Sequence, residues 1–135
     1  MITENKEQLL MLKEDHDILR QYLINNSPKL MYDQHMQKEH LEKINAANVL
    51  GSNEFPNTAS RLYSTVIIRD SVTRTNLEYK LVPPSDSDKW NGNISALTPF
   101  GLALMGLQKG ESFIWQLSKR KKYYTVVEVR NSAYI

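Results

Sequence analysis

Three histidines, His16, His35 and His40, are the first residues of this sequence that suggest a metal site. Two ligands on one helix need a spacing of three or four residues, because only that spacing places both side chains on one face. His35 and His40 are five residues apart, which is about 140° around a helix. We therefore predict no metal site; His16 lies on the predicted helical seam, and a histidine packed beside Gln is the simpler interpretation.

Carboxylates could hold a divalent cation or exchange protons, and they gather in two short stretches. Glu14, Asp15 and Asp17 lie within one turn of a predicted helix, and Asp86 and Asp88 lie in a turn-rich loop. Neither stretch has a nucleophile, a base or a third ligand close in the sequence. We interpret the first as a solvated helix face and the second as residues of Asx turns, and we predict no catalytic residue and no cofactor.

The composition limits the classes of protein that the chain can represent. Its 135 residues suffice for one ordinary domain, or for a small domain with an appendage. It contains no cysteine, which excludes disulfides, thiolate catalysis and cysteine-based zinc sites. No apolar run reaches about 18 residues, and the first segment carries acids where a secretion signal needs an apolar centre. We expect a cytoplasmic protein without a membrane partner.

Basic residues are concentrated in the second part of the chain. Residues 1–50 hold six Lys and Arg against eight Asp and Glu, whereas residues 51–135 hold eleven against seven. Four cations are consecutive and precede two tyrosines: Lys119, Arg120, Lys121 and Lys122. The simplest interpretation is the solvated tip of a hairpin. The alternative is a contact with nucleic-acid phosphates or with an acidic protein surface.

The first 50 residues show the period of a helix that packs against another helix. Apolar residues and one histidine recur at steps of three, four and seven: Ile2, Leu9, Leu12, His16, Leu19 and Leu23. We predict one helix over residues 4–24 and a second over residues 28–49, joined by a tip at Asn25, Asn26 and Ser27. The second seam is half polar, so we expect a thin antiparallel coiled coil that leans on the rest of the chain.

After a linker at residues 51–60, which is rich in Gly, Pro, Asn and Ser, the period changes to two. Alternating stretches predict four strands, near residues 62–69, 76–82, 112–117 and 123–129, with a short fifth at residues 94–96. Trp90 and Trp115 are assigned to the core. Before the third long strand, Thr98 is a good helix cap and Pro99 a good first helical residue. We predict an α+β domain over residues 61–135, in which one short helix lies on a twisted antiparallel sheet.

The order of these elements, with the words NISALTPFGLALMG and KGES, resembles the C-terminal domain of the bacterial transcription elongation factors GreA and GreB. Members of that family typically have the motif IS-x-x-SP-x-G-x-ALLG-x-x-x-GD at this position. The resemblance covers residues 61–130 by motif and residues 1–50 by architecture. It implies an FKBP-like fold that binds RNA polymerase at the rim of its secondary channel, with Thr98, Pro99, Phe100 and Gly101 in the contact. An exposed Phe100 beside the amides of a helix start suits such a contact. The alternative is a plain helix cap with Phe100 in the core.

Members of that family that stimulate RNA cleavage carry carboxylates at the coiled-coil tip, and this sequence has none at Asn25, Asn26 and Ser27. In this respect it resembles the Rnk-like relatives, which have a short coiled coil without tip acids. The resemblance implies a non-enzymatic transcription regulator that does not stimulate cleavage. Three alternatives stay open: a transcript-cleavage factor of the Gre type, an FKBP-like prolyl isomerase, and a general interaction module that is a monomer or a weak dimer.

Overall fold

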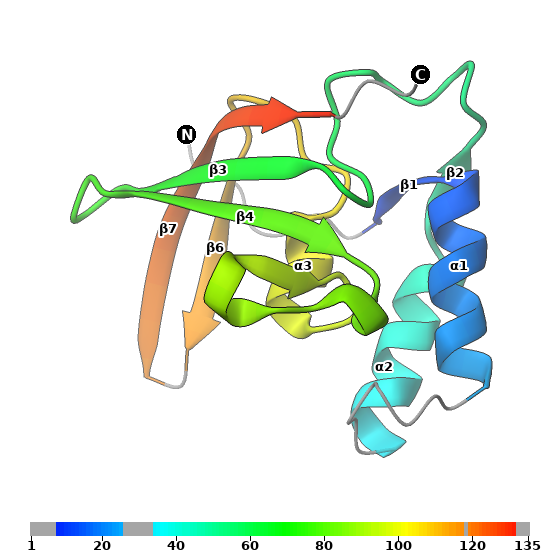
Figure 1. The fold of residues 1–135 in the computed structure, drawn as a ribbon. Helices are drawn as coiled ribbons and strands as arrows, with labels where there is room; N and C mark the ends of the chain where they lie inside the picture. The colour runs from blue at the N-terminus through cyan, green and yellow to red at the C-terminus, as the bar shows by residue number, and fades with distance from the viewer. Residues whose placement is uncertain (1–7, 26–33, 118, 132–135) are drawn as a thin grey trace.

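The fold combines a small helical part with a five-stranded sheet (Figure 1). The computed structural model describes residues 8–25, 34–117 and 119–131. Two short strands and two helices form the first part, in the order β1 (Leu10–Leu12), α1 (Lys13–Ile24), α2 (Gln34–Asn45) and β2 (Asn48–Leu50). Among the described helices, none has the length and apolar character needed to cross a bilayer.

The first helix begins later than its sequence period predicts. Residues 10–12 form β1, which pairs in parallel with β2, so the predicted helix is wrong for this stretch. Residues 4–7 lie outside the described part. Val49, predicted near the end of the second helix, also belongs to this ladder. Met11 and Leu12 are buried, and their backbone groups find hydrogen-bond partners in β2. Tertiary pairing therefore overrides the local helical period.

Helices α1 and α2 lie side by side and run in opposite directions (Figure 1). Arg20 donates from Nε to Asn45 Oδ1 at 3.1 Å, and Gln37 donates from Nε2 to the Leu23 carbonyl at 2.5 Å. Residues 26–33, which connect the two helices, lie outside the described part. The coiled coil that the sequence suggests therefore stays a prediction.

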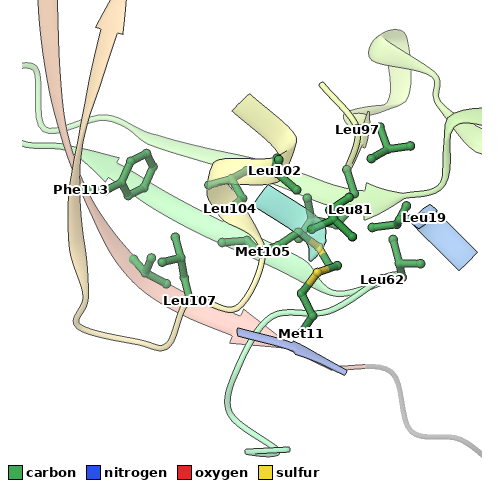
Figure 2. Close-up of a cluster of buried hydrophobic side chains, with 14 of the residues drawn as sticks. Met11, Leu19, Leu62, Leu81, Leu97, Leu102, Leu104, Met105, Leu107 and Phe113 are labelled. Carbon is green, nitrogen blue, oxygen red and sulfur yellow. The ribbon is translucent and has the colours of Figure 1, made fainter. Parts of the chain in front are cut away.

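One hydrophobic core holds these helices to the sheet. Leu19 and Leu23 of α1 and Ile44 of α2 have no exposed surface, and they belong to the same cluster as Leu62 and Leu81. Figure 2 shows Leu19 close to Leu62 and Leu81, in one group with the buried side chains of α3. The prediction that the helices lean on the second part of the chain is correct, because each helix buries its apolar stripe there.

The sheet has the strand order β5-β4-β3-β7-β6. Its strands are β3 (Thr65–Asp70), β4 (Asn76–Val82), β5 (Asn93–Ser95), β6 (Ser112–Leu117) and β7 (Arg120–Arg130). Neighbours pair antiparallel except β5, which runs parallel to β4. The predicted purely antiparallel sheet is wrong at this edge, because the loop at residues 83–92 carries the chain back along β4 through two short 3-10 turns.

The predicted strand positions are mostly confirmed. β4 and β6 have the predicted bounds, and β7 is longer than its predicted stretch at both ends. The first strand starts later than predicted, because residues 61–64 form a tight turn in which Tyr63 has a φ of 70°. Along β3, Val66 and Ile68 are buried while Ile67 between them is only half-buried. We call the side that carries Val66 and Ile68 the core face, and the opposite side the outer face.

Residues 51–60, predicted as a linker, contain no helix or strand but are packed against the rest of the protein. Phe55 is buried in a second small cluster. Ser60 is buried as well, and its hydroxyl donates to the Leu104 carbonyl and accepts from the Leu107 amide at 2.9 Å. The division of the chain into two domains at this segment stays a prediction.

Candidate partner-binding surface

The short helix α3 (Pro99–Leu104) starts at the residue that the sequence predicts. Thr98 caps it, because its Oγ1 accepts from the Gly101 amide at 3.0 Å and donates to the Ser95 carbonyl at 2.8 Å. The Ser95 hydroxyl accepts in turn from the Leu97 amide at 3.1 Å. The end of β5 and the start of α3 are therefore one hydrogen-bonded unit. The Gly101 amide is used within this unit and is not offered to a partner.

Gly101 stands where α3 touches the end of β5. A Cβ atom added there would lie 2.0 Å from the Ser95 carbonyl oxygen and 2.9 Å from Thr98 Oγ1. The first distance is far inside van der Waals contact with a backbone atom, so only glycine fits. Gly101 is itself buried, and its place is structural: it lets α3 approach the sheet and so sets the position of Pro99 and Phe100.

Phe100 is the centre of an aromatic cluster on the core face. Its ring centroid lies 5.0 Å from that of Trp115 and 5.4 Å from that of Tyr79, both in edge-to-face geometry. Tyr124 and Phe113 complete the cluster at 6.0 and 6.3 Å. Such ring pairs add about 0.5–1.5 kcal/mol each beyond the burial of their area. The cluster therefore holds Phe100 in one orientation.

The aromatic cluster is open on one side. Pro99 is exposed, whereas Phe100, Tyr79 and Trp115 are half-buried. The freely exposed Phe100 that a simple anchor would need is thus not present, and the ring packs against the core. Burial raises the pKa of the Tyr79 phenol, so its hydroxyl stays neutral at physiological pH. We call Pro99, Phe100, Tyr79 and Trp115 the aromatic surface; rigid rings of this kind lose little entropy when a partner covers them.

Of the four consecutive cations, Lys119 precedes β7, and the other three alternate between its two faces. Lys119, Arg120 and Lys121 are exposed. Lys122 points to the core face, where its Nζ lies 3.3 Å from Asp70 Oδ2. Two amides of the turn after β3, assisted by Lys122, hold the pKa of Asp70 below its usual value. Lys122 is therefore engaged within the protein, and three of the four cations face solvent.

Asp15 departs furthest from its sequence interpretation. Instead of lying on a solvated face it is only 5% exposed, and its Oδ2 accepts from the Leu62 amide at 2.8 Å. Burial raises its pKa to about 6, although the Leu62 hydrogen bond and the charge of Arg61 act in the opposite direction. A signal for this was present in the sequence: Asp15 stands four residues before Leu19, so both occupy the buried face of α1.

The other candidates for chemistry do not converge on a metal site within the described residues. Glu14 and Asp17 are exposed as predicted, and Asp88 accepts from the Trp90 amide at 3.1 Å in a tight turn. His40 is buried, which lowers its pKa. Trp90, predicted for the core, is 88% exposed, because the turn that Asp88 closes lies at the surface.

Of the predicted coiled-coil tip, only Asn25 belongs to the described residues. Its amide donates to the Gln21 carbonyl at 3.0 Å and so ends α1. Asn26 and Ser27 lie outside the described part. The lack of an acid at these three positions is therefore a statement about the sequence alone.

Comparison with known proteins points to one family. The profile described as "Transcription elongation factor, GreA/GreB, C-term" matches residues 56–131, which is more than half of the chain. The transcription elongation factor GreA of Syntrophobacter fumaroxidans is 31% identical over 90 residues, which are 67% of this chain and 58% of that protein. The chain thus covers less than two thirds of the length of the curated relatives that it matches.

Solved structures agree with this match. The prokaryotic transcription elongation factor GreA/GreB from Nitrosomonas europaea superposes with a TM-score of 0.72 and 25% identity, over 93% of this chain and 100% of that one. Gfh1 of Thermus aquaticus has a TM-score of 0.50 and 20% identity over the same shares, and this likeness concerns the fold alone.

Proposed function

Because the chain belongs to the GreA/GreB family of transcription elongation factors, we propose that it binds bacterial RNA polymerase near the secondary channel and regulates transcription without being an enzyme. The polymerase contact is made by the aromatic surface at the start of α3. The family supports this kind of partner, and the curated relatives are themselves transcription elongation factors.

The placement of the segment Thr98–Gly101 is the observation that carries this proposal. The segment belongs to the sequence word shared with the family, and its backbone is fixed from below by Gly101 and by the Thr98 cap. Pro99 is exposed at its top, and Phe100 stands beside it among four rings. A rigid aromatic and proline surface is the type of site where few residues supply most of the binding energy.

We also propose that the protein does not stimulate RNA cleavage. Holding a catalytic Mg²⁺ at the polymerase centre requires carboxylate oxygens at the tip between the two helices. The nearest acid before that tip in α1, Asp17, is eight residues from Asn25, or roughly 12 Å by helical rise. Asp15 is further away and is engaged with the Leu62 amide. The helical part then serves as a blunt element that occupies the channel.

Affinity for purified bacterial core RNA polymerase, measured by biolayer interferometry, tests the contact. We expect a micromolar or tighter dissociation constant, and a loss of at least tenfold for Pro99→Glu, which adds a charge to the aromatic surface while leaving the Thr98 cap intact. Lys109→Glu is the matched control, because this exposed cation lies in the turn before β6. No binding by the unaltered protein, or equal binding by Pro99→Glu, would contradict the proposal.

Cleavage of RNA in stalled elongation complexes tests the second statement separately. We expect that the protein, added in excess over polymerase, leaves the cleavage rate at its intrinsic level while GreA raises it. A rate that rises with the concentration of this protein would refute the proposal, without bearing on polymerase binding.

A further inference from the structure

The outer face of the sheet carries cations and an aromatic ring that the polymerase contact does not use. Lys121, Tyr123 and Thr125 alternate along β7, and all three point to the outer face because the residues between them point to the core. Successive members of this row are roughly 7 Å apart. Tyr123 is half-buried and Lys121 is exposed.

Strand pairing brings further residues beside this row. Arg69 of β3 is the register partner of Thr125, so it is a diagonal neighbour of Tyr123 at roughly 7–8 Å. Ile114 of β6 is the direct partner of Tyr123 on its other side. The guanidinium group of Arg69 donates from Nη1 to Asn76 Oδ1 of β4 at 3.3 Å, on the side away from β7, so Ile114 is the register neighbour of the ring and Arg69 is a more distant cation on the same face.

The two turns that end this half of the sheet are basic as well. Arg74 lies in the turn between β3 and β4, and Lys119 and Arg120 lie where β7 begins; all three are exposed. Both turns stand at the end of the sheet away from α1 and α2 (Figure 1). We call the following residues the basic strip: Arg69, Arg74, Lys119, Arg120, Lys121 and Tyr123.

Carboxylates of the outer face stand beside only one end of the basic strip. Among the residues that the structure describes, none of its five cations takes part in an ion pair. Asp70 is close in sequence but lies on the core face with Lys122. The acids of the outer face, Glu78 and Glu128, both lie opposite Ile67 of β3 and are diagonal neighbours of Arg69, and Glu128 pairs with Arg130. The other members of the strip lie further along, in the turn after β3 and at the start of β7. Cations that take part in no recorded ion pair, along this edge of the sheet, produce a local positive potential that attracts a polyanion.

We propose that the basic strip binds single-stranded nucleic acid, with the five cations on phosphates and the Tyr123 ring stacked on a base. Proteins that bind single strands with little sequence preference combine cations, which contact phosphates, with an aromatic ring on which a base stacks. An acidic protein would use the cations but not the ring, and a duplex keeps its bases stacked away from Tyr123. Arg69, Lys121 and Tyr123 lie on the face opposite the aromatic surface, while Arg120 has the strand parity of Lys122 at the exposed start of β7, so Tyr123→Ala tests this binding separately from the polymerase contact.

Fluorescence anisotropy with a fluorescein-labelled 12-nucleotide oligouridine tests the proposal with the full chain and without polymerase. We expect binding that weakens with salt, as counterion release requires. The triple variant Lys119→Gln, Arg120→Gln, Lys121→Gln should bind at least tenfold more weakly. The slope of log K against log salt should become smaller in magnitude by about 2, because each lost contact with a single-strand phosphate removes about 0.7. Lys38→Gln, which removes an exposed cation of α2, should change the affinity by less than twofold.

Tyr123 separates stacking from simple charge attraction. Tyr123→Ala should weaken binding about fivefold or more, and Tyr123→Phe should restore it, because stacking needs the ring and not the hydroxyl. Circular dichroism confirms that each variant is folded before its affinity is compared. Unchanged affinity of the triple variant, unchanged affinity of Tyr123→Ala, or equal binding of a duplex of the same length or of polyglutamate would each overturn the proposal.

Discussion

Two junctions join helices to the sheet in this molecule, and they rely on different physics. At the start of α3 the contact is steric and neutral. Gly101 presses against the Ser95 carbonyl, the Thr98 hydroxyl closes the cap, and Phe100 packs among aromatic rings. None of these groups carries a charge, so this junction should be insensitive to pH.

The junction of α1 and α2 with the sheet contains titratable groups. Asp15 accepts from the Leu62 amide while 5% exposed, and His40 is buried with a hydrogen bond to the backbone of Leu97. Burial raises the pKa of Asp15 and lowers the pKa of His40, because it disfavours the charged form of each. The comparison shows that the proposed binding segment is held by uncharged contacts, whereas the free energy that holds α1 and α2 to the sheet changes with pH.

Replacing Gly101 is the most severe test of the steric junction. Gly101→Ala places a Cβ 2.0 Å from a backbone oxygen, so α3 must move away from β5. We expect a loss of about 4 kcal/mol or more in the free energy of unfolding, measured by urea denaturation. Gly51→Ala is the matched control, because a Cβ there meets nothing within 4 Å, and it should cost less than about 1 kcal/mol. Equal losses in the two variants would show that the close approach at Gly101 is not a constraint.

Removing the ring of Phe100 has the next largest expected effect. Phe100→Ala deletes the centre of the aromatic cluster and should lower the free energy of unfolding by about 3 kcal/mol. Phe100→Leu keeps most of the volume and should lose roughly half as much. The same urea denaturation at pH 5 and pH 7.5 should return the same differences, since the ring partners of Phe100 are Tyr79, Phe113, Trp115 and Tyr124, which are uncharged at both pH values. A loss of stability that differed between the two pH values would contradict the statement that this junction is insensitive to pH.

The titratable junction predicts a stability that changes with pH. Because the folded pKa of Asp15, about 6, is above the ordinary value of 3.8, ionisation penalises the folded state at pH 7 and above. The penalty disappears as the pH falls through 6 toward 4. Its upper limit is about 3 kcal/mol, at 1.36 kcal/mol for each pKa unit.

Asp15→Asn isolates this effect, because the amide oxygen can still accept from the Leu62 amide. We expect the variant to be more stable than the unaltered protein at pH 7.5, by about 2–3 kcal/mol, and equally stable near pH 4. His40 acts in the other direction: its lowered pKa adds stability above about pH 6.5 that is lost on acidification, in both proteins. Asp17→Asn, at an exposed site of α1, should bring no gain. A difference between Asp15→Asn and the unaltered protein that stays constant with pH would contradict this account.

The helix cap gives the smallest expected effect. Thr98→Ala removes the acceptor for the Gly101 amide and should lower the free energy of unfolding by about 1 kcal/mol, to the same extent at pH 5 and pH 7.5. Thr98→Ser keeps the hydroxyl and should lose less than half of that. Thermal unfolding at several pH values measures the stability of both variants. A loss in Thr98→Ala that depended on pH would mean that a titratable group contributes to this junction.

Predictions from the sequence succeeded where a segment's neighbours are close in the chain. The bounds of β4 and β6 follow from alternation over six or seven residues, and the start of α3 follows from Thr98 and Pro99 alone. They failed where the partner is distant. β1 was predicted as helix because its ladder partner, β2, stands 38 residues away, and Asp15 was predicted as solvated because the Leu62 amide is 47 residues away.

The candidate sites follow the same division. The sequence by itself determined four features: the motif around Thr98 that resembles the family, the helix cap, the run of cations at the start of β7, and the change of hydrophobic period between the two parts. Each of these depends only on residue type and short spacing. Only the tertiary structure decided that Phe100 is half-buried, that Lys122 turns inward to Asp70, and that Arg69 lies opposite Thr125 on the face that carries Tyr123. Strand register and burial are set by the packing of the whole chain, and no local pattern encodes which distant strand will lie alongside.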